Sequence, residues 1–331
     1  MKKFLIQLVL FLTICLIPVF LYLIIDPFKV IYKYSEQINT TKDYQITGNR
    51  DFQSTQLLLW NYKKYNYDSF ILGNSRSIFY QVNTWNKYVN GNCFHFNASS
   101  ESLYGIDCKL KLLDELKLDI KNVLIILDEG TFSVTKNSPG HLFIKHPALS
   151  KESLFAFHAE MFKGFFPKAI FAYIDLFITG ERKKYMGTYG IIGNVWRHDV
   201  KTNQLTYFIY DNEIKNNPEL YYADKKALLK KRGVVQRISA PSIFSEQDVL
   251  LKSIYSVLKS HDSNYKIIIS PLYDQIKINP ADFNYLTSLF GPENVYDFSG
   301  INSITNDYHN YYETSHYRPI VCDSILGIVY K

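Results

Sequence analysis

Cysteine is scarce in this chain, with four residues among 331. Cys15 lies inside an apolar N-terminal run, so three cysteines remain for the rest of the chain: Cys93, Cys108 and Cys322. An odd number cannot form a complete disulfide framework, which excludes a small disulfide-stabilised scaffold. Cys93 and Cys108 either pair in an oxidising compartment or stay free and buried.

Other class-defining patterns are also absent from the sequence. No pair of cysteines has zinc-site spacing and the eight histidines are scattered, so we expect no metal and no cofactor. The formal net charge is +6, but the basic runs Lys183-Lys184 and Lys230-Lys231-Arg232 are short and follow no repeated pattern. Such runs are typical of a solvated face, so nucleic acid is not an expected partner.

Apolar residues, by contrast, fill the N-terminus. The run from Phe4 to Ile25 has clearly polar side chains only at Gln7 and Thr13, and about 20 apolar residues cross the hydrocarbon layer as a helix. A cleaved signal peptide is the alternative, but its apolar core is usually shorter, and no small-x-small cleavage site follows this run. Lys2 and Lys3 precede it, so we expect a single-pass membrane protein with a cytoplasmic N-terminus and an extracytoplasmic body.

Strand and helix patterns alternate in two parts of the chain. Apolar runs predict strands at 69–72, 93–97, 123–127, 266–271 and 295–298. Three- and four-residue apolar spacing predicts a helix at 103–116, and further helices are expected at 245–260, 281–290 and 318–329, the last with Pro319 in its first turn. Repeated strand-helix-strand units predict an α/β fold with a parallel sheet.

These patterns divide the chain into three parts. We expect a transmembrane anchor at 1–25, a linker and start of the body at 26–68, and a main domain at 69–331 with an insertion at about 130–240. The aromatic stretch 154–173 of the insertion predicts helices packed on the core, or a surface that rests on the membrane or covers the site. The stretch 190–210 predicts a hairpin.

Two segments far apart in the sequence carry residues suited to serine chemistry. Ser75 follows the first predicted strand, in a turn opened by Gly73, and Glu313 and His316 precede the final helix. Ligands of a parallel sheet bind beyond the carboxyl ends of its strands, where Ser75 is expected. His316 can accept the Ser75 proton, and Glu313 can reach His316 across one helical turn. Nucleophile, base and orienting acid are the three roles of a serine acyl-transfer site.

Gly73-Asn74-Ser75 after a strand, with Glu313-x-x-His316 before the last helix, resembles the SGNH (GDSL-like) hydrolase superfamily, in particular its membrane-anchored relatives in cell-envelope polymer acylation. The resemblance covers about 69–129 and 265–331. It implies a flavodoxin-like three-layer α/β/α fold and a catalytic set of Ser75, His316 and Glu313. It also implies a serine esterase or O-acyltransferase that acts on acylated cell-envelope polysaccharide, or on a small acyl donor, through an acyl-enzyme.

The two middle sequence blocks differ from the superfamily pattern. The second block usually gives a glycine N–H to the oxyanion, but the corresponding stretch here is Phe-Asn-Ala-Ser-Ser at 96–100, so Asn97 is the candidate donor. The third block usually gives an asparagine, and here it reads Leu-Asp-Glu-Gly at 127–130. Arg76 either binds an anionic group of the substrate or braces the turn.

Two other interpretations fit the sequence. The chain could be a catalytically silent SGNH-fold protein that binds polysaccharide or scaffolds a membrane-bound O-acyltransferase, as the missing oxyanion donors would allow. It could also be a plain flavodoxin-like domain without relation to the superfamily. A His316 ring far from Ser75 would favour the last interpretation.

Overall fold

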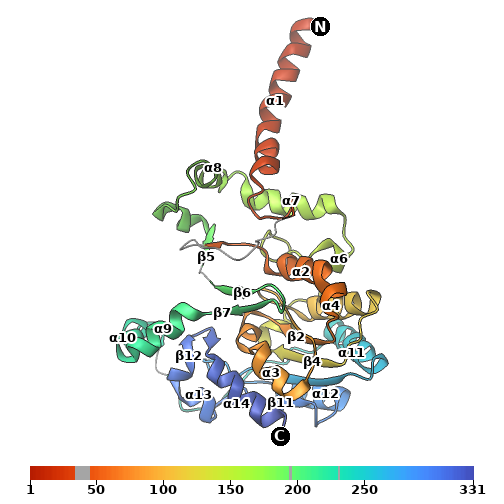
Figure 1. Cartoon of the computed structure of the whole chain (residues 1–331), viewed down its shortest axis with the longest axis vertical. Helices are drawn as coiled ribbons and strands as arrows, with labels where there is room; N and C mark the ends of the chain where they lie inside the picture. Colours follow the sequence, from red (N-terminus) through yellow and green to blue (C-terminus); the bar gives the residue numbers. More distant parts are fainter. Residues whose placement is uncertain (34–44, 194–195, 230–231) are drawn as a thin grey trace.

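The computed structural model describes residues 1–33, 45–193, 196–229 and 232–331 (Figure 1). At its centre is a five-stranded parallel sheet with the strand order β11-β9-β4-β2-β3. The strands are β2 (Ser69–Gly73), β3 (Cys93–Asn97), β4 (Asn122–Leu127), β9 (Asn264–Ile269) and β11 (Val295–Asp297). The predicted α/β fold with a parallel sheet is therefore confirmed.

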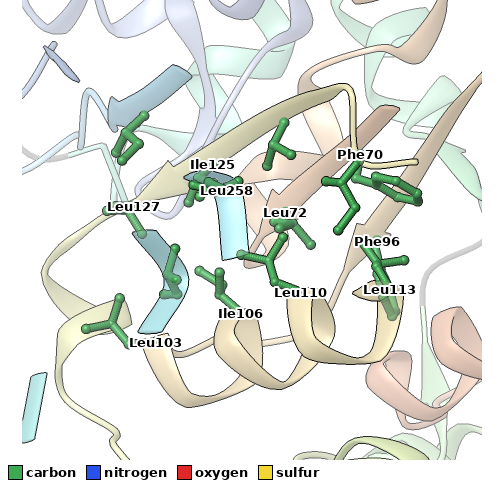
Figure 2. Packing of buried hydrophobic residues seen from close by; sticks show 14 of the residues in the cluster. Phe70, Leu72, Phe96, Leu103, Ile106, Leu110, Leu113, Ile125, Leu127 and Leu258 are labelled. Carbon is green, nitrogen blue, oxygen red and sulfur yellow. The ribbon is translucent and has the colours of Figure 1, made fainter. Parts of the chain in front are cut away.

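Successive residues of each strand enter different hydrophobic clusters, because side chains alternate across a sheet. Phe70 and Leu72 of β2 pack in one cluster, whereas Ile71 packs in another. On the first face, α4 (Leu103–Glu115) lays its apolar stripe against the strands. Figure 2 shows Leu110 and Leu113 of this helix next to side chains of β2 and β3. Apolar side chains at helical spacing on α4 therefore pack against apolar side chains at every second position of the strands.

Helices contribute to both of these clusters. The first cluster contains residues of α2 (Arg50–Tyr65), α4, α11 (Ser245–Ser260) and α12 (Pro280–Phe290). The second contains residues of α3 (Val82–Val89), α9 (Phe208–Asn216), α10 (Pro218–Lys225) and α14 (Pro319–Val329). Since α2 belongs to the core, the predicted linker is already part of the folded body from Arg50 onward.

Helix α1 (Lys2–Ile25) projects away from the body in Figure 1. It is long and apolar enough to cross a membrane, and only 11% of its most apolar window is buried. Its last turn is different, because Tyr22 and Ile25 are buried in a third cluster with α7 (Leu154–Phe165) and α8 (Ile170–Thr179). We refer to α7 and α8 as the collar helices. The foot of α1 is thus part of the body's hydrophobic packing.

The hairpin predicted at 190–210 is displaced. Strand β6 (Arg197–Asp199) pairs antiparallel with β7 (Gln204–Thr206), and the chain turns between them with Asn203 in the left-handed region at φ 60°. Strand β7 ends at Thr206, so Phe208 and Ile209, which lie inside the predicted hairpin, begin α9 instead. At the start of the predicted hairpin, Ile192 and Gly193 form β5 (Ile192–Gly193), which pairs with β1 (Gln45–Ile46) and not with the second half of the hairpin.

Shorter elements complete the described residues. They are α5 (Glu129–Phe132), α6 (Pro147–Ser150), α13 (Ser303–Asn306), the 3-10 helices η1 (Ser75–Phe79), η2 (Lys184–Tyr189) and η3 (Tyr308–Asn310), and strands β8 (Arg237–Ile238), β10 (Ile276–Lys277), β12 (Tyr311–Glu313) and β13 (His316–Tyr317).

Cys93 and Cys108 are free and buried, which decides against the disulfide. Residues 34–44 of the predicted linker, 194–195 of the predicted hairpin and Lys230-Lys231 of the basic run lie outside the described residues. The division into anchor, linker and main domain stays a prediction.

Candidate functional site

Ser75 lies directly beyond the carboxyl end of β2. Gly73 has φ 148°, and a Cβ atom at this position would lie 2.8 Å from the carbonyl oxygen of Ile126, so the turn requires glycine. Asn74 then caps η1, since its Oδ1 accepts the N–H of Arg76 at 3.0 Å. Ser75 is the first residue of η1, so its own backbone N–H has no acceptor within that helix.

Glu313 and His316 lie on a β-hairpin and not at the start of a helix. They face each other as paired residues of β12 and β13, and α14 begins only at Pro319. The expectation that they meet across one helical turn is therefore wrong. Proline fits the first turn of a helix, and the residue before it, Arg318, is extended, which ends the hairpin before the helix begins.

The hairpin brings the acid, the base and Ser75 into one hydrogen-bonded chain. His316 Nε2 lies 2.9 Å from Ser75 Oγ, and His316 Nδ1 contacts Glu313 Oε1. With the proton on Nδ1, the ring donates to Glu313 and accepts the Ser75 hydroxyl proton. Burial raises the pKa of Glu313, but hydrogen bonds from His316 and from the Ser315 N–H outweigh it, so this pKa lies below its ordinary value. Glu313 is thus ionised at neutral pH.

Asp128 joins the serine turn to the end of β4, and Arg76 joins the turn to the hairpin. Its Oδ2 accepts from Asn74 Nδ2 at 2.5 Å and pairs with Arg76 Nη1 at 2.6 Å, and its side chain is 2% exposed. Arg76 Nε donates to the carbonyl oxygen of Ser315 at 2.9 Å. Of the two roles expected for Arg76, these contacts are those of a brace that links β2 to the β12–β13 hairpin.

Asn97 ends β3 beside Gly73 in the parallel register. Its Oδ1 accepts from Arg50 Nε at 2.9 Å, and its Nδ2 is buried without a hydrogen-bond partner among the described residues. Arg50 Nη2 also binds Asn203 Oδ1 at 2.8 Å. Burial lowers the pKa of Arg50 to about 9, so a buried cation lies next to Asn97.

Ser75 and His316 open onto a pocket of about 350 Å³. Its other walls include Arg50, Ser99 and Ser100, with Trp196 and Tyr207 from the insertion. Among the described residues that line this pocket, neither Asn97 nor Arg76 is present.

Sequence reasoning missed Arg50, Trp196 and Tyr207. Arg50 lies in the predicted linker, and the two aromatic residues lie in the insertion, where no motif marks them. An aromatic residue or a single arginine has many structural uses, so only the fold identifies these three as part of the pocket wall.

Comparison of the chain with protein-family models, with curated proteins and with solved structures gives no significant match. The geometry around Ser75 is therefore the basis on which a function can be proposed.

Proposed function

We propose that the chain is a membrane-anchored serine esterase or O-acyltransferase of the SGNH type. The observation that carries the proposal is the hydrogen-bonded chain from Glu313 through His316 to Ser75 at the edge of the sheet. A serine hydroxyl needs such a base to become a useful nucleophile. A flavodoxin-like three-layer α/β/α fold requires a parallel sheet with helices on both faces. The five-stranded parallel sheet and the two hydrophobic clusters that it forms with helices support this part of the proposal.

The proposed reaction has two steps. His316 Nε2 removes the hydroxyl proton of Ser75 as Oγ attacks the carbonyl carbon of an ester, and the departing alcohol takes this proton. The acyl group is then an ester of Ser75. In the second step, His316 deprotonates water or a sugar hydroxyl, which attacks the acyl-Ser75, and the proton passes from His316 to the departing Ser75 Oγ. Glu313 holds the ring in the required tautomer and stabilises its protonated form in both steps.

Negative charge develops on the acyl oxygen in each step. The Ser75 backbone N–H and the Ser99–Ser100 loop in the pocket wall are the groups we assign to stabilise it. Arg50 adds a buried positive charge to the same wall. This arrangement replaces the glycine and asparagine donors of the superfamily pattern.

The walls from the insertion support a saccharide as the acyl acceptor or as the acylated substrate. Trp196 and Tyr207 line the pocket and lie against each other, and aromatic side chains in a pocket wall are suited to packing against a sugar ring. An extracytoplasmic body tethered by α1 would meet envelope polysaccharide there, with the N-terminus in the cytoplasm.

The contacts of the last turn of α1 favour a helix that stays attached to the body over a signal peptide that is removed. The Tyr22 hydroxyl lies 3.0 Å from His158 Nδ1, and Ile25 is 7% exposed within the collar cluster. Cleavage at the end of the helix would remove side chains that the body uses for its own packing.

A catalytically silent scaffold for a membrane-bound O-acyltransferase is the second candidate. One observation favours it: both carboxylate oxygens of Asp128, in the third block, are occupied by Asn74, Arg76 and Thr131. Asp128 accepts all three of these hydrogen bonds, and a carboxylate has no proton to donate to an oxyanion. Loss of one such donor costs roughly 10²–10³-fold in rate.

Purified full-length chain and its Ser75→Ala variant separate the two candidates. An enzyme hydrolyses p-nitrophenyl acetate, and the variant retains its fold and loses this activity. A scaffold shows no activity in either protein, yet cells that carry Ser75→Ala acylate their polymer normally while a deletion strain does not. Ser324→Ala, an exposed serine on α14, is the matched control.

A further inference from the structure

The collar helices expose large apolar side chains on the side away from the core. Phe155 on α7 is 84% exposed, and Phe171 and Ile178 on α8 are 79% and 75% exposed. The opposite sides of both helices are buried in the cluster that holds the foot of α1. Grouped aromatic and aliphatic side chains of this size are unfavourable in water and mark an interaction surface.

The position of the collar relative to α1 limits what can cover this surface. Tyr22 lies in the last turn of α1. Its ring packs edge-on against Phe162 of α7 at a centroid distance of 5.7 Å, and its hydroxyl contacts His158, also on α7. Figure 1 shows α7 running across the foot of α1, with α8 on the other side. The collar therefore begins where the apolar span of α1 ends, which is the level of a bilayer surface if α1 spans it.

Exposed cations flank the apolar side chains. Lys168 follows α7 in the chain, and Arg182 and Lys184 follow α8, next to the exposed carboxylate of Glu181. Lys163 and Lys183 are paired with Glu160 and Asp175. An apolar face bordered by lysine and arginine is the pattern of a helix that lies in the interfacial layer of a membrane, where the cations contact anionic headgroups.

We propose that the collar helices lie in the interfacial layer of the bilayer that α1 crosses, with Phe155, Phe171 and Ile178 inserted among the lipids. The surface gives the body a second attachment, so it does not swing freely on a single helix. The segment that follows the collar helices connects them to the pocket, because Ile191 is buried in the collar cluster and Gly193 lines the same pocket as Ser75. The pocket is thus held close to the membrane.

Lipid contact can be measured on the full-length chain in nanodiscs of phosphatidylcholine and phosphatidylglycerol. Phe155→Trp, Phe171→Trp and Ile178→Trp each add one fluorophore to the three native tryptophans. Val249→Trp, at an exposed site on α11, is the matched control. We expect lipids brominated near the headgroup to quench the added emission of each collar variant at least twofold more than that of Val249→Trp.

Equal quenching in the collar and control variants would overturn the proposal. Blue-shifted collar emission without bromine quenching would also overturn it, because a protein surface, such as a second copy of the chain, would then cover the collar. Three separate collar sites keep the test valid if one variant fails to fold. The measurement does not depend on Ser75, so it stands whatever the outcome for the proposed esterase activity.

Discussion

His316 Nε2 lies 2.9 Å from Ser75 Oγ, although 241 positions separate the two residues in the chain. The parallel sheet fixes the end of β2, and with it Ser75, at one edge of the sheet. Contacts of Arg76 and Tyr311 hold the hairpin that carries His316 against this edge. Arg76 binds the carbonyl oxygen of Ser315, and the Tyr311 hydroxyl donates to the carbonyl oxygen of Pro271 at 2.9 Å. The hairpin is thus fixed to the sheet edge at more than one point.

Replacing Glu313 by Gln is expected to lower kcat/KM for an ester by roughly 10²–10⁴-fold. The amide keeps the size of the side chain but can neither stabilise the protonated ring nor select its tautomer. Glu313→Asp keeps the charge on a shorter side chain and should retain more activity than Gln. Equal activity of Gln and wild-type enzyme would remove Glu313 from the proposed mechanism.

Replacing Asp128 by Ala should destabilise the serine turn. It leaves Arg76 and the Asn74 amide without their carboxylate partner, which we expect to cost about 2–3 kcal/mol in free energy of unfolding, measured with urea. Labelling of Ser75 by an active-site probe should slow as well, because the turn loses its support. Asp119→Ala is the control, because Asp119 pairs with Lys121 on the exposed surface: it should change the free energy of unfolding far less than Asp128→Ala does.

Acid should destabilise the body through His146. Burial lowers its pKa to about 4 from an ordinary 6.5, with Asp51 opposing the shift. The ring is neutral, since Nδ1 accepts the Ala148 N–H at 3.0 Å and Nε2 lies 3.2 Å from Gln56 Oε1. The unfolded chain gains a proton near pH 6.5 and the folded chain only near 4. This stability is therefore complete above about pH 6.5 and is lost as the pH falls toward 4.

Urea unfolding at several pH values checks this prediction. The His146→Gln variant should show a weaker loss of stability between pH 6.5 and 4 than the wild-type chain, while His261→Gln, at a partly exposed surface histidine, should follow the wild type. An unchanged pH profile for His146→Gln would mean that other groups control the acid sensitivity.

The foot of α1 can be tested by two truncations in detergent. Removal of residues 1–20 keeps Tyr22 and Asp26, whereas removal of 1–26 deletes both. Asp26 accepts the N–H groups of Val30, Ile31 and Tyr32 at 2.9, 3.1 and 3.1 Å. We expect the longer truncation to lower Tm by roughly 5 °C relative to the shorter one, because buried packing and these bonds are lost. Equal Tm values would favour a separable N-terminal segment.

Much of the central sheet follows from local sequence signals. β3 has the bounds predicted, and so does α11, because apolar period and flanking polar residues agree there. The turn at Ser75 could also be predicted from the sequence, since Gly73 directly precedes Asn74, which caps η1. These features depend on neighbouring residues, which a sequence displays.

Features set by tertiary contacts were not predictable in the same way. A three-residue spacing between Glu313 and His316 fits a helical turn and a hairpin equally, and only the position of Pro319 separates them. Arg50 stood in a predicted linker, yet Asn97 and Asn203, from distant segments, determine its burial. Asn97 was the candidate oxyanion donor, and it is not among the described residues that line the pocket, whereas Arg50, which donates to its Oδ1, is.

The most direct test of the account is stoichiometric labelling of the full-length chain with a fluorophosphonate, followed by mass spectrometry of its peptides. We predict one adduct per chain, on Ser75, that disappears in Ser75→Ala and forms at least about tenfold more slowly in His316→Ala. No adduct on Ser75 in well-folded protein, or labelling that does not depend on His316, would contradict the claim that this serine is an activated nucleophile.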